Sequence, residues 1–244
     1  MLDFAGKRVL VGGGSRGIGR AIAAAFARAG AQVSVSGRDA EALAETRRLT
    51  GGPVQICDLG DAEAVRRHVA AAAEAFGGLD IVVNNGSAFA TDDTPEAWDT
   101  ACRIDLMGLV NTNAAAAPIL TAGGGGVIVN IASISAFHPT PNAAPYGAIK
   151  AAIVHYTKSQ ALGLAPHNIR VNAVAPGAIS FPGHFWERRK VEDPDHYQRI
   201  VDRIPFGRMG TPEEVADVVL FLASPLARWV TGQIVMVDGG QELA

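Results

Sequence analysis

The chain has 244 residues, of which 48% are hydrophobic and 18% are charged, and its formal net charge is −3. This composition excludes an intrinsically disordered chain, and the small negative charge gives no electrostatic basis for binding nucleic acid or an anionic membrane surface. The two cysteines, Cys57 and Cys102, stand far apart, which excludes a disulfide framework and a cysteine-rich zinc site. With no signal-peptide-like apolar stretch near Met1, we expect a cytoplasmic protein.

Short apolar runs rich in β-branched residues alternate with longer segments that have apolar residues at helical spacing. The runs cover residues 8–12, 32–36, 54–57, 80–84, 126–131, 169–174 and 233–237. Strands that are apolar on both faces are typical of parallel sheets covered by helices on each side. We therefore expect an α/β fold, a single Rossmann-type domain over residues 1–244 with a doubly wound, parallel, seven-stranded sheet and helices on both faces.

A glycine-rich turn, GGSRGIG, follows the first run and places Gly13, Gly17 and Gly19 before a predicted helix. Glycines let the backbone approach a pyrophosphate, and the N-terminus of the following helix offers unpaired N–H groups. The strand before the turn and the helix after it are the context that this motif requires. The turn therefore predicts a dinucleotide site, with a tight turn that binds no ligand as the alternative.

The end of the second run predicts which dinucleotide binds. An acidic residue at this position usually holds a free 2′-hydroxyl, and a basic residue holds a 2′-phosphate. The sequence here is Ser36-Gly37-Arg38, and Asp39 is expected to be the N-cap of the next helix. Arg38, with Arg16 inside the glycine turn, therefore predicts NADP(H) over NAD(H). The alternative is that both arginines are only solvated surface charges.

Tyr146 and Lys150 lie four residues apart at the start of a predicted helix, so they share one helix face. A phenol is a poor base at neutral pH, and a nearby ammonium group stabilises its phenolate. The pair therefore suits acid/base chemistry. Ser133 follows the fifth run, and we expect its hydroxyl in the same crevice as the glycine turn, where it can donate to a substrate oxygen.

Together these motifs resemble the classical subgroup of the short-chain dehydrogenase/reductase family, similar to 3-oxoacyl-carrier-protein reductases and related carbonyl reductases. Further matching positions are Asp58, the sequence NNGS (84–87), Pro176-Gly177 and the segment RMGTPEEVADVVLFLAS that starts at Arg208. The resemblance implies an NADP(H)-dependent oxidoreductase that interconverts a ketone and a secondary alcohol of small size. It also implies a homotetramer or homodimer.

The resemblance implies a role for each matching residue. Tyr146 is the proton donor in reduction and the acceptor in oxidation, Lys150 binds the nicotinamide ribose, and Ser133 steadies the carbonyl oxygen. The implied cofactor-binding residues are Gly13, Ser15, Arg16, Gly17, Ile18, Gly19, Arg38, Asp58, Leu59, Asn84, Gly86, Tyr146, Lys150, Pro176, Gly177, Ile179 and Ser180.

One departure from the family pattern concerns the catalytic machinery. Asp105 stands where the family typically has an asparagine that helps to hold a water beside the lysine. An aspartate accepts hydrogen bonds but does not donate them, so Asp105 is expected to join the catalytic residues with a changed pH optimum or a weaker proton relay. Two alternatives stay open: an enoyl or dienoyl thioester reductase of the same family, and a non-catalytic cofactor-binding regulatory protein.

The least regular stretch, residues 181–210, contains three prolines and separates the last two predicted strands. Long excursions of this kind often form lids, and Phe181, Phe185 and Trp186 would give such a lid an aromatic face toward the substrate. The alternative is that these rings only pack the segment onto the body. The histidines lack metal-binding spacing, so no metal site is expected.

Overall fold

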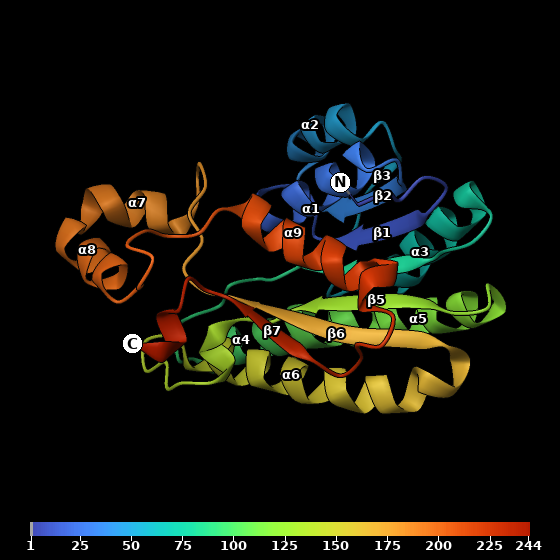
Figure 1. Cartoon of the computed structure of the whole chain (residues 1–244). Coiled ribbons are helices and arrows are strands. Elements are labelled where there is room, and N and C mark those ends of the chain that lie inside the picture. Colours follow the sequence, from blue (N-terminus) through green and yellow to red (C-terminus); the bar gives the residue numbers. More distant parts are fainter. Residues whose placement is uncertain (1) are drawn as a thin grey trace.

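The computed structural model describes residues 2–244, in which seven strands form one parallel sheet. The strand order is β3-β2-β1-β4-β5-β6-β7 (Figure 1). The strands are β1 Arg8–Gly12, β2 Gln32–Gly37, β3 Val54–Ile56, β4 Ile81–Asn84, β5 Gly126–Ile131, β6 Ile169–Pro176 and β7 Ile234–Val237. The predicted doubly wound parallel sheet is confirmed, and each observed strand overlaps its predicted run.

Helices cover both faces of this sheet, as the doubly apolar strands predict. On one face lie α1 (Gly17–Arg28), α2 (Ala40–Thr50) and α9 (Pro212–Ala223), and on the other lie α3 (Ala62–Phe76), α5 (Gly108–Ala122) and α6 (Ala144–Leu164) (Figure 1). A shorter helix, α4 (Pro95–Ala101), leads into a π-helical turn, η1 (Cys102–Met107), before α5. Within residues 2–244 there are also four 3₁₀ turns, which are η2 Ile134–Ala136, η3 Ala165–His167, η4 Pro225–Ala227 and η5 Gln241–Leu243.

The first strand shows how the sheet separates two apolar layers. Val9 and Val11 pack into the cluster under α1 and α9, whereas Leu10 packs into the cluster under α3, α5 and α6. All three side chains are fully buried, and each contributes about 1.5–3 kcal/mol of hydrophobic stabilisation. This two-sided burial is the physical reason why the central strands are continuous apolar runs.

The strand order places the carboxyl ends of β1 and β4 next to each other. The chain runs outward from β1 to β3 and then returns to β4, so the winding direction reverses between β1 and β4. In open α/β sheets, ligands bind in the crevice outside the strand ends at such a reversal. The glycine turn after β1 and the loop after β4 meet at this place.

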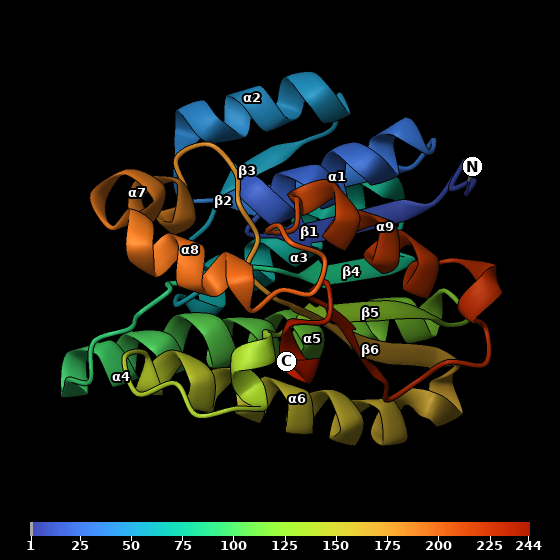
Figure 2. The same ribbon diagram turned by 60° about the vertical axis from the view of Figure 1, so that its left-hand side comes forward.

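Two helices that the sequence did not predict project from the body in the segment 181–210 (Figures 1 and 2). They are α7 (Phe185–Glu192) and α8 (Pro194–Asp202). Trp186, Tyr197 and Ile200 pack against a small buried cluster of Ala178, Ile204 and Met209, which anchors the two helices to the end of β6.

None of the helices within residues 2–244 combines the length and the apolar character that crossing a membrane requires.

A buried histidine on α3 gives the fold a testable response to acid. His68 is 3% exposed, its Nε2 lies 3.3 Å from the Ser34 hydroxyl, and burial lowers its pKa to about 4. The unfolded chain binds this proton near pH 6.5, so the contribution of a neutral His68 to stability is complete above that pH and is lost as the pH falls toward 4. When the pH falls from 7.5 to 5, the buried His68 should therefore lower the free energy of unfolding by about 2 kcal/mol.

His68→Gln should remove that part of the acid sensitivity. We expect the urea-unfolding free energy of the variant to fall by about 2 kcal/mol less than that of the parent between the two pH values. Equal losses in the two proteins would show that His68 does not couple folding to protonation.

Candidate functional site

A cavity of about 1100 Å³ opens at the carboxyl ends of β1, β4, β5 and β6. Most of the predicted site residues line it, although they come from seven separate stretches of sequence. They are Gly13, Ser15, Arg16, Ile18, Arg38, Asp58, Leu59, Gly86, Ser133, Tyr146, Lys150, Pro176, Gly177, Ile179, Phe181, Phe185 and Trp186.

The glycine turn is held in place by the loop after β4. Gly13 has φ +72°, and a Cβ at this position would lie 2.5 Å from the Cα of Gly86, so the two backbones touch. The Asn85 amide donates to the Gly13 carbonyl oxygen over 2.7 Å. Sequence spacing does not indicate that Asn85 belongs to the site, because this contact joins residues 72 positions apart.

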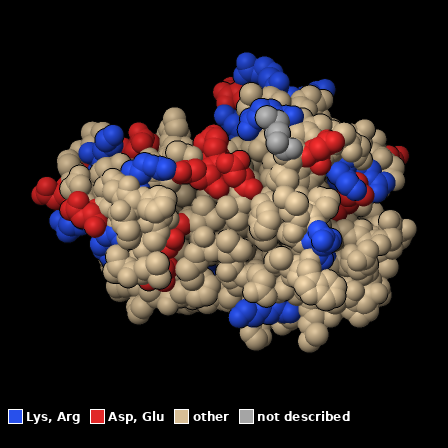
Figure 3. Space-filling view, in the orientation of Figure 1, with Lys and Arg blue, Asp and Glu red and all other residues tan. Residues whose placement is uncertain are grey.

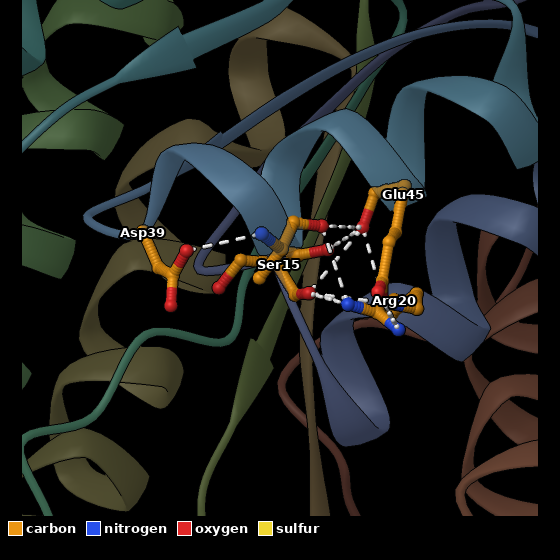
Figure 4. Close-up of polar contacts among 7 residues, drawn as sticks. Ser15, Arg20, Asp39 and Glu45 are labelled. Atoms are coloured by element: carbon orange, nitrogen blue, oxygen red, sulfur yellow. Dashed lines mark hydrogen bonds and ion pairs between the residues drawn. The ribbon is translucent and has the colours of Figure 1, made fainter.

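A polar cluster supports the other side of the turn (Figure 4). Arg20 donates from Nε to the Ser15 carbonyl oxygen over 2.9 Å, and its Nη1 lies 2.7 Å from Glu45 Oε2. Asp39 accepts from the Ala42 N–H over 3.0 Å, which confirms that it is the N-cap of α2. The Asp39 carboxylate is therefore engaged in capping α2.

Two arginines at this end of the cavity have no carboxylate partner. Arg16 and Arg38 both line the cavity, and within residues 2–244 neither forms an ion pair. Arg20, by contrast, is already paired with Glu45. The two guanidinium groups therefore remain available to an anionic ligand.

Helix α6 brings the predicted acid/base pair together. Lys150 is 2% exposed, and its Nζ lies 5.4 Å from the centroid of the Tyr146 ring. The ammonium group donates to the Ile131 carbonyl oxygen over 3.2 Å at the end of β5. This bond fixes the charge beneath the phenol, because a buried ammonium needs an acceptor.

Asp105 lies on the π-helical turn η1 and faces the same lysine. The distance from Asp105 Oδ2 to Lys150 Nζ is 3.8 Å, and both side chains are almost fully buried. Asp105 also accepts from the Ala88 N–H over 2.7 Å and from the Ser87 hydroxyl. The carboxylate therefore joins the loop after β4 to the lysine, which is a contact that sequence spacing did not reveal.

Ser133 follows β5 directly and is 6% exposed. Its Oγ accepts from the Ser135 N–H over 3.1 Å. One lone pair of the hydroxyl is therefore engaged, while its proton stays available to an acceptor in the cavity.

Four predicted cofactor residues do not line the cavity. Asn84 donates from its buried amide to Asn113 and Asn130, over 2.7 and 2.9 Å, and so links β4 to α5 and β5. Ser180 donates to Glu187 over 2.7 Å, away from the cavity. Gly17 lies under the Phe181 ring, and Gly19 packs against the Gly13 carbonyl.

An aromatic cluster extends from the acid/base pair to the helices α7 and α8. Phe89 packs edge-on against the Tyr146 ring, with centroids 5.1 Å apart, and lies 5.8 Å from Phe185. Phe181 stacks on His184 at 4.3 Å. Phe89 and His184 were not predicted as site residues, because both enter through contacts that only the folded chain creates.

Positive charge gathers where this cluster meets the glycine turn. Burial, together with the charges of Arg16 and Arg188, lowers the pKa of His184 to about 4. The imidazole is therefore neutral at physiological pH. Burial likewise raises the pKa of the nearby Cys57 thiol to about 11, which keeps it protonated. Within residues 2–244, no three His, Cys, Asp or Glu side chains are grouped to hold a metal ion.

Comparison with known proteins agrees with this geometry. Residues 13–242 match the family model described as Enoyl-(Acyl carrier protein) reductase. The chain is 38% identical over 252 residues to Dehydrogenase/reductase SDR family member 4 of Oryctolagus cuniculus, covering 97% of this chain and 94% of the relative. Two similar solved structures are levodione reductase and a 7 alpha-hydroxysteroid dehydrogenase complexed with NADH and 7-oxo glycochenodeoxycholic acid. Levodione reductase has TM-score 0.92 and 30% identity, covering 99% of each chain. The hydroxysteroid dehydrogenase has TM-score 0.90 and 33% identity, covering 98% of this chain and 95% of that one.

Proposed function

Because this chain belongs to the short-chain dehydrogenase/reductase family, whose members are oxidoreductases with an NAD(P) cofactor, we propose that it is an NADP(H)-dependent enzyme interconverting a ketone and a secondary alcohol. One observation carries the proposal. The Lys150 ammonium group lies 5.4 Å from the centroid of the Tyr146 ring, and both residues line one cavity with Ser133. This is the arrangement that proton transfer to a carbonyl oxygen requires.

The residues at the glycine turn fit a dinucleotide. Helix α1 starts at Gly17 with no acidic residue in its first turn and no side-chain cap, so its terminal N–H groups remain available. A Cβ on Gly17 would project against Phe181, a ring that itself lines the cavity. We propose that this turn holds the pyrophosphate, that Arg16 and Arg38 hold the 2′-phosphate, and that Lys150 holds the nicotinamide ribose.

The bound nicotinamide supplies the hydride, and this chain supplies the proton and the charge stabilisation. Tyr146 donates its proton to the carbonyl oxygen in reduction and takes it back in oxidation. Lys150 stabilises the phenolate that remains. Ser133 donates a hydrogen bond to the same oxygen as negative charge develops there.

The remaining proposals concern the whole chain. We propose one domain over residues 1–244, in which residues 181–210 cover the substrate, and a cytoplasmic homotetramer or homodimer. Leu162 and Trp229 are 81% and 98% exposed, and exposed apolar side chains of this size suit burial against another copy. The surface over β6, β7 and α6 carries few charges compared with α7 and α8, as Figure 3 shows.

A panel of ketones tests the proposal directly. The protein should consume NADPH with at least one ketone and release the matching secondary alcohol. Release of a saturated thioester from an enoyl or dienoyl thioester would favour the alternative that the family model's description suggests. Binding of NADPH without turnover of any compound would favour the regulatory protein.

The pairing of Asp105 with Lys150 should set the pH dependence of alcohol oxidation. Oxidation needs the phenolate of Tyr146, and a carboxylate 3.8 Å from the lysine weakens the positive field that stabilises it. Asp105→Asn removes that negative charge with almost no change of shape. The midpoint of the pH–rate profile for alcohol oxidation should therefore move to lower pH.

Ser87→Ala is the matched control for this variant. It removes the hydroxyl that Asp105 accepts from, but it leaves the carboxylate and its charge in place. Its pH–rate profile should keep the parent midpoint. If Asp105→Asn also keeps that midpoint, Asp105 does not influence the proton transfer.

A further inference from the structure

The segment that follows β7, residues 238–243, turns back onto the cavity. Asp238 accepts from the Gly240 N–H over 3.0 Å and from the Glu242 N–H over 2.9 Å, and these bonds fold the short turn η5. Figure 1 shows this turn at the same end of the molecule as α7 and α8. Gln241 and Glu242 line the cavity.

Gln241 fixes this segment against the end of β6. Its Oε1 accepts from the Ala178 N–H over 3.0 Å. A Cβ on Gly177 would lie 2.7 Å from the Asp238 Cβ and 2.8 Å from Gln241 Oε1, so the two segments are in direct contact. The 238–243 segment is therefore held beside the residues proposed to flank the nicotinamide.

Glu242 connects the same segment to the loop that precedes the acid/base helix. Its Oε1 lies 2.5 Å from His138 Nδ1, and the two side chains are 16% and 35% exposed. The loop that contains Ser135 and His138 packs closely on the start of α6. A Cβ on Gly147 would lie only 3.1 Å from the Ser135 carbonyl oxygen. The His138–Glu242 pair thus forms part of the wall of the cavity that Tyr146 also lines.

The pair leaves hydrogen-bonding capacity toward the cavity. A carboxylate beside Nδ1 keeps the proton of a neutral imidazole on that nitrogen, so Nε2 becomes an acceptor. Within residues 2–244, no protein group bonds to His138 Nε2 or to the second carboxylate oxygen of Glu242. Both residues line the cavity and are partly exposed, so a ligand there that brings a hydrogen-bond donor can bond to these atoms.

The charge of the cavity decides which donor fits. Arg188, Arg189 and Arg203 line it, and within residues 2–244 none of them forms an ion pair. A cationic donor such as an ammonium group would meet an excess of positive charge, because the cationic side chains that line the cavity outnumber its carboxylates. The cationic ones are Arg16, Arg38, Lys150, Arg188, Arg189 and Arg203, and the carboxylates are those of Asp58, Asp92, Asp193 and Glu242. A neutral hydroxyl meets no such repulsion.

We propose that His138 recognises a hydroxyl group of the substrate and that Glu242 is a positioning residue that holds the imidazole in its accepting tautomer. The substrate class is then a hydroxylated ketone with an apolar or ring-shaped body that contacts the aromatic cluster. This inference rests on the proposed function for its reaction, but the recognition itself is a separate property of the cavity wall.

The test compares cyclohexanone with its 2-, 3- and 4-hydroxy derivatives in NADPH-dependent reduction. At least one hydroxylated isomer should have a kcat/KM about tenfold above that of cyclohexanone, as expected for one added hydrogen bond to the partly exposed His138 ring. His138→Phe keeps a ring but removes both nitrogens, and it should bring this ratio to about one. His155→Phe alters an exposed histidine on α6 that does not line the cavity, and it should keep the parent ratio.

The positioning role of Glu242 has its own readout. Glu242→Ala should lower the ratio toward that of His138→Phe, and combining the two substitutions should lower it no further. Glu242→Gln, whose amide oxygen still accepts from Nδ1, should restore most of the selectivity. A ratio in Glu242→Gln as low as in Glu242→Ala would overturn the positioning role.

An NMR measurement separates the inference from the proposed reaction. In protein labelled with ¹³C-histidine, the ring signal that His138→Phe removes should shift on adding at least one of the three hydroxycyclohexanones and not on adding cyclohexanone. If no ketone is reduced, the proposed function fails, and this shift still decides the recognition. Absence of both a hydroxyl preference and a selective shift would overturn the inference.

Discussion

Tyr146→Phe should lower kcat/KM for ketone reduction by about 10²–10⁴-fold, the usual contribution of a positioned general acid. The substitution removes only the hydroxyl, and the remaining ring can keep its edge-on contact with Phe89. Lys150 keeps its bond to the Ile131 carbonyl oxygen, so the floor of the cavity should not change. Steady-state kinetics should therefore show a loss in kcat, while direct titration should show NADPH binding within about threefold of the parent.

Tyr156→Phe provides the matched control on the same helix. Tyr156 packs in an apolar cluster on α6 and does not line the cavity. Removing its hydroxyl should leave reduction near the parent rate, so a selective loss at Tyr146 would identify the proton donor. If Tyr146→Phe retained more than about a tenth of the parent kcat/KM, Tyr146 would not be the general acid.

The sheet was predictable because its strands are buried on both faces, which leaves a pattern that no other element produces so clearly. The strand ends were less predictable, because they depend on partner strands. β6 continues to Pro176, where Ala175 and Pro176 pair with Met236 and Val237 of β7. A proline at the end of a strand gives no sequence signal for that extension.

Helix α8 starts at a local signal in the sequence. Asp193 accepts from the His196 N–H over 3.1 Å as the N-cap of α8, and Pro194 occupies the first helical position. An aspartate followed by a proline is a recognised helix start. Helix α7 has no fully buried residue and little apolar periodicity, whereas α8 carries Tyr197, Ile200 and Val201 at helical spacing, which is a second signal for that helix.

Within the site, residues carried by local motifs were predicted, and residues brought in by tertiary contacts were not. Asn85, Phe89 and Glu242 act on neighbours from other segments, and no spacing in the sequence indicates those contacts. Ser180 is the opposite case, a predicted site residue that does not line the cavity. Its neighbours Ile179 and Phe181 line the cavity, so extended backbone turns the side chain between them the other way, toward Glu187.

Arg38→Ala should lower the ratio of NADPH to NADH efficiency by about 10–100-fold, because a charge-assisted hydrogen bond contributes about 1.5–3 kcal/mol. Arg38 follows β2, lines the cavity and has no ion-pair partner within residues 2–244. The next residue, Asp39, caps α2 through the Ala42 N–H, so the arginine is the side chain that we propose for the 2′-phosphate. The ratio of kcat/KM for the two cofactors with one ketone measures the effect.

Charge reversal at the same position sharpens this test. Arg38→Asp places a carboxylate where a free 2′-hydroxyl can donate to it and a 2′-phosphate is repelled, so the preference should move further toward NADH. Arg47→Ala is the control, because Arg47 is exposed on the last turn of α2 and does not line the cavity. Its cofactor ratio should equal that of the parent. A ratio for Arg38→Ala within about twofold of the parent would contradict the proposed selection of NADP(H) by Arg38, since loss of one charge-assisted bond has to change the ratio by more.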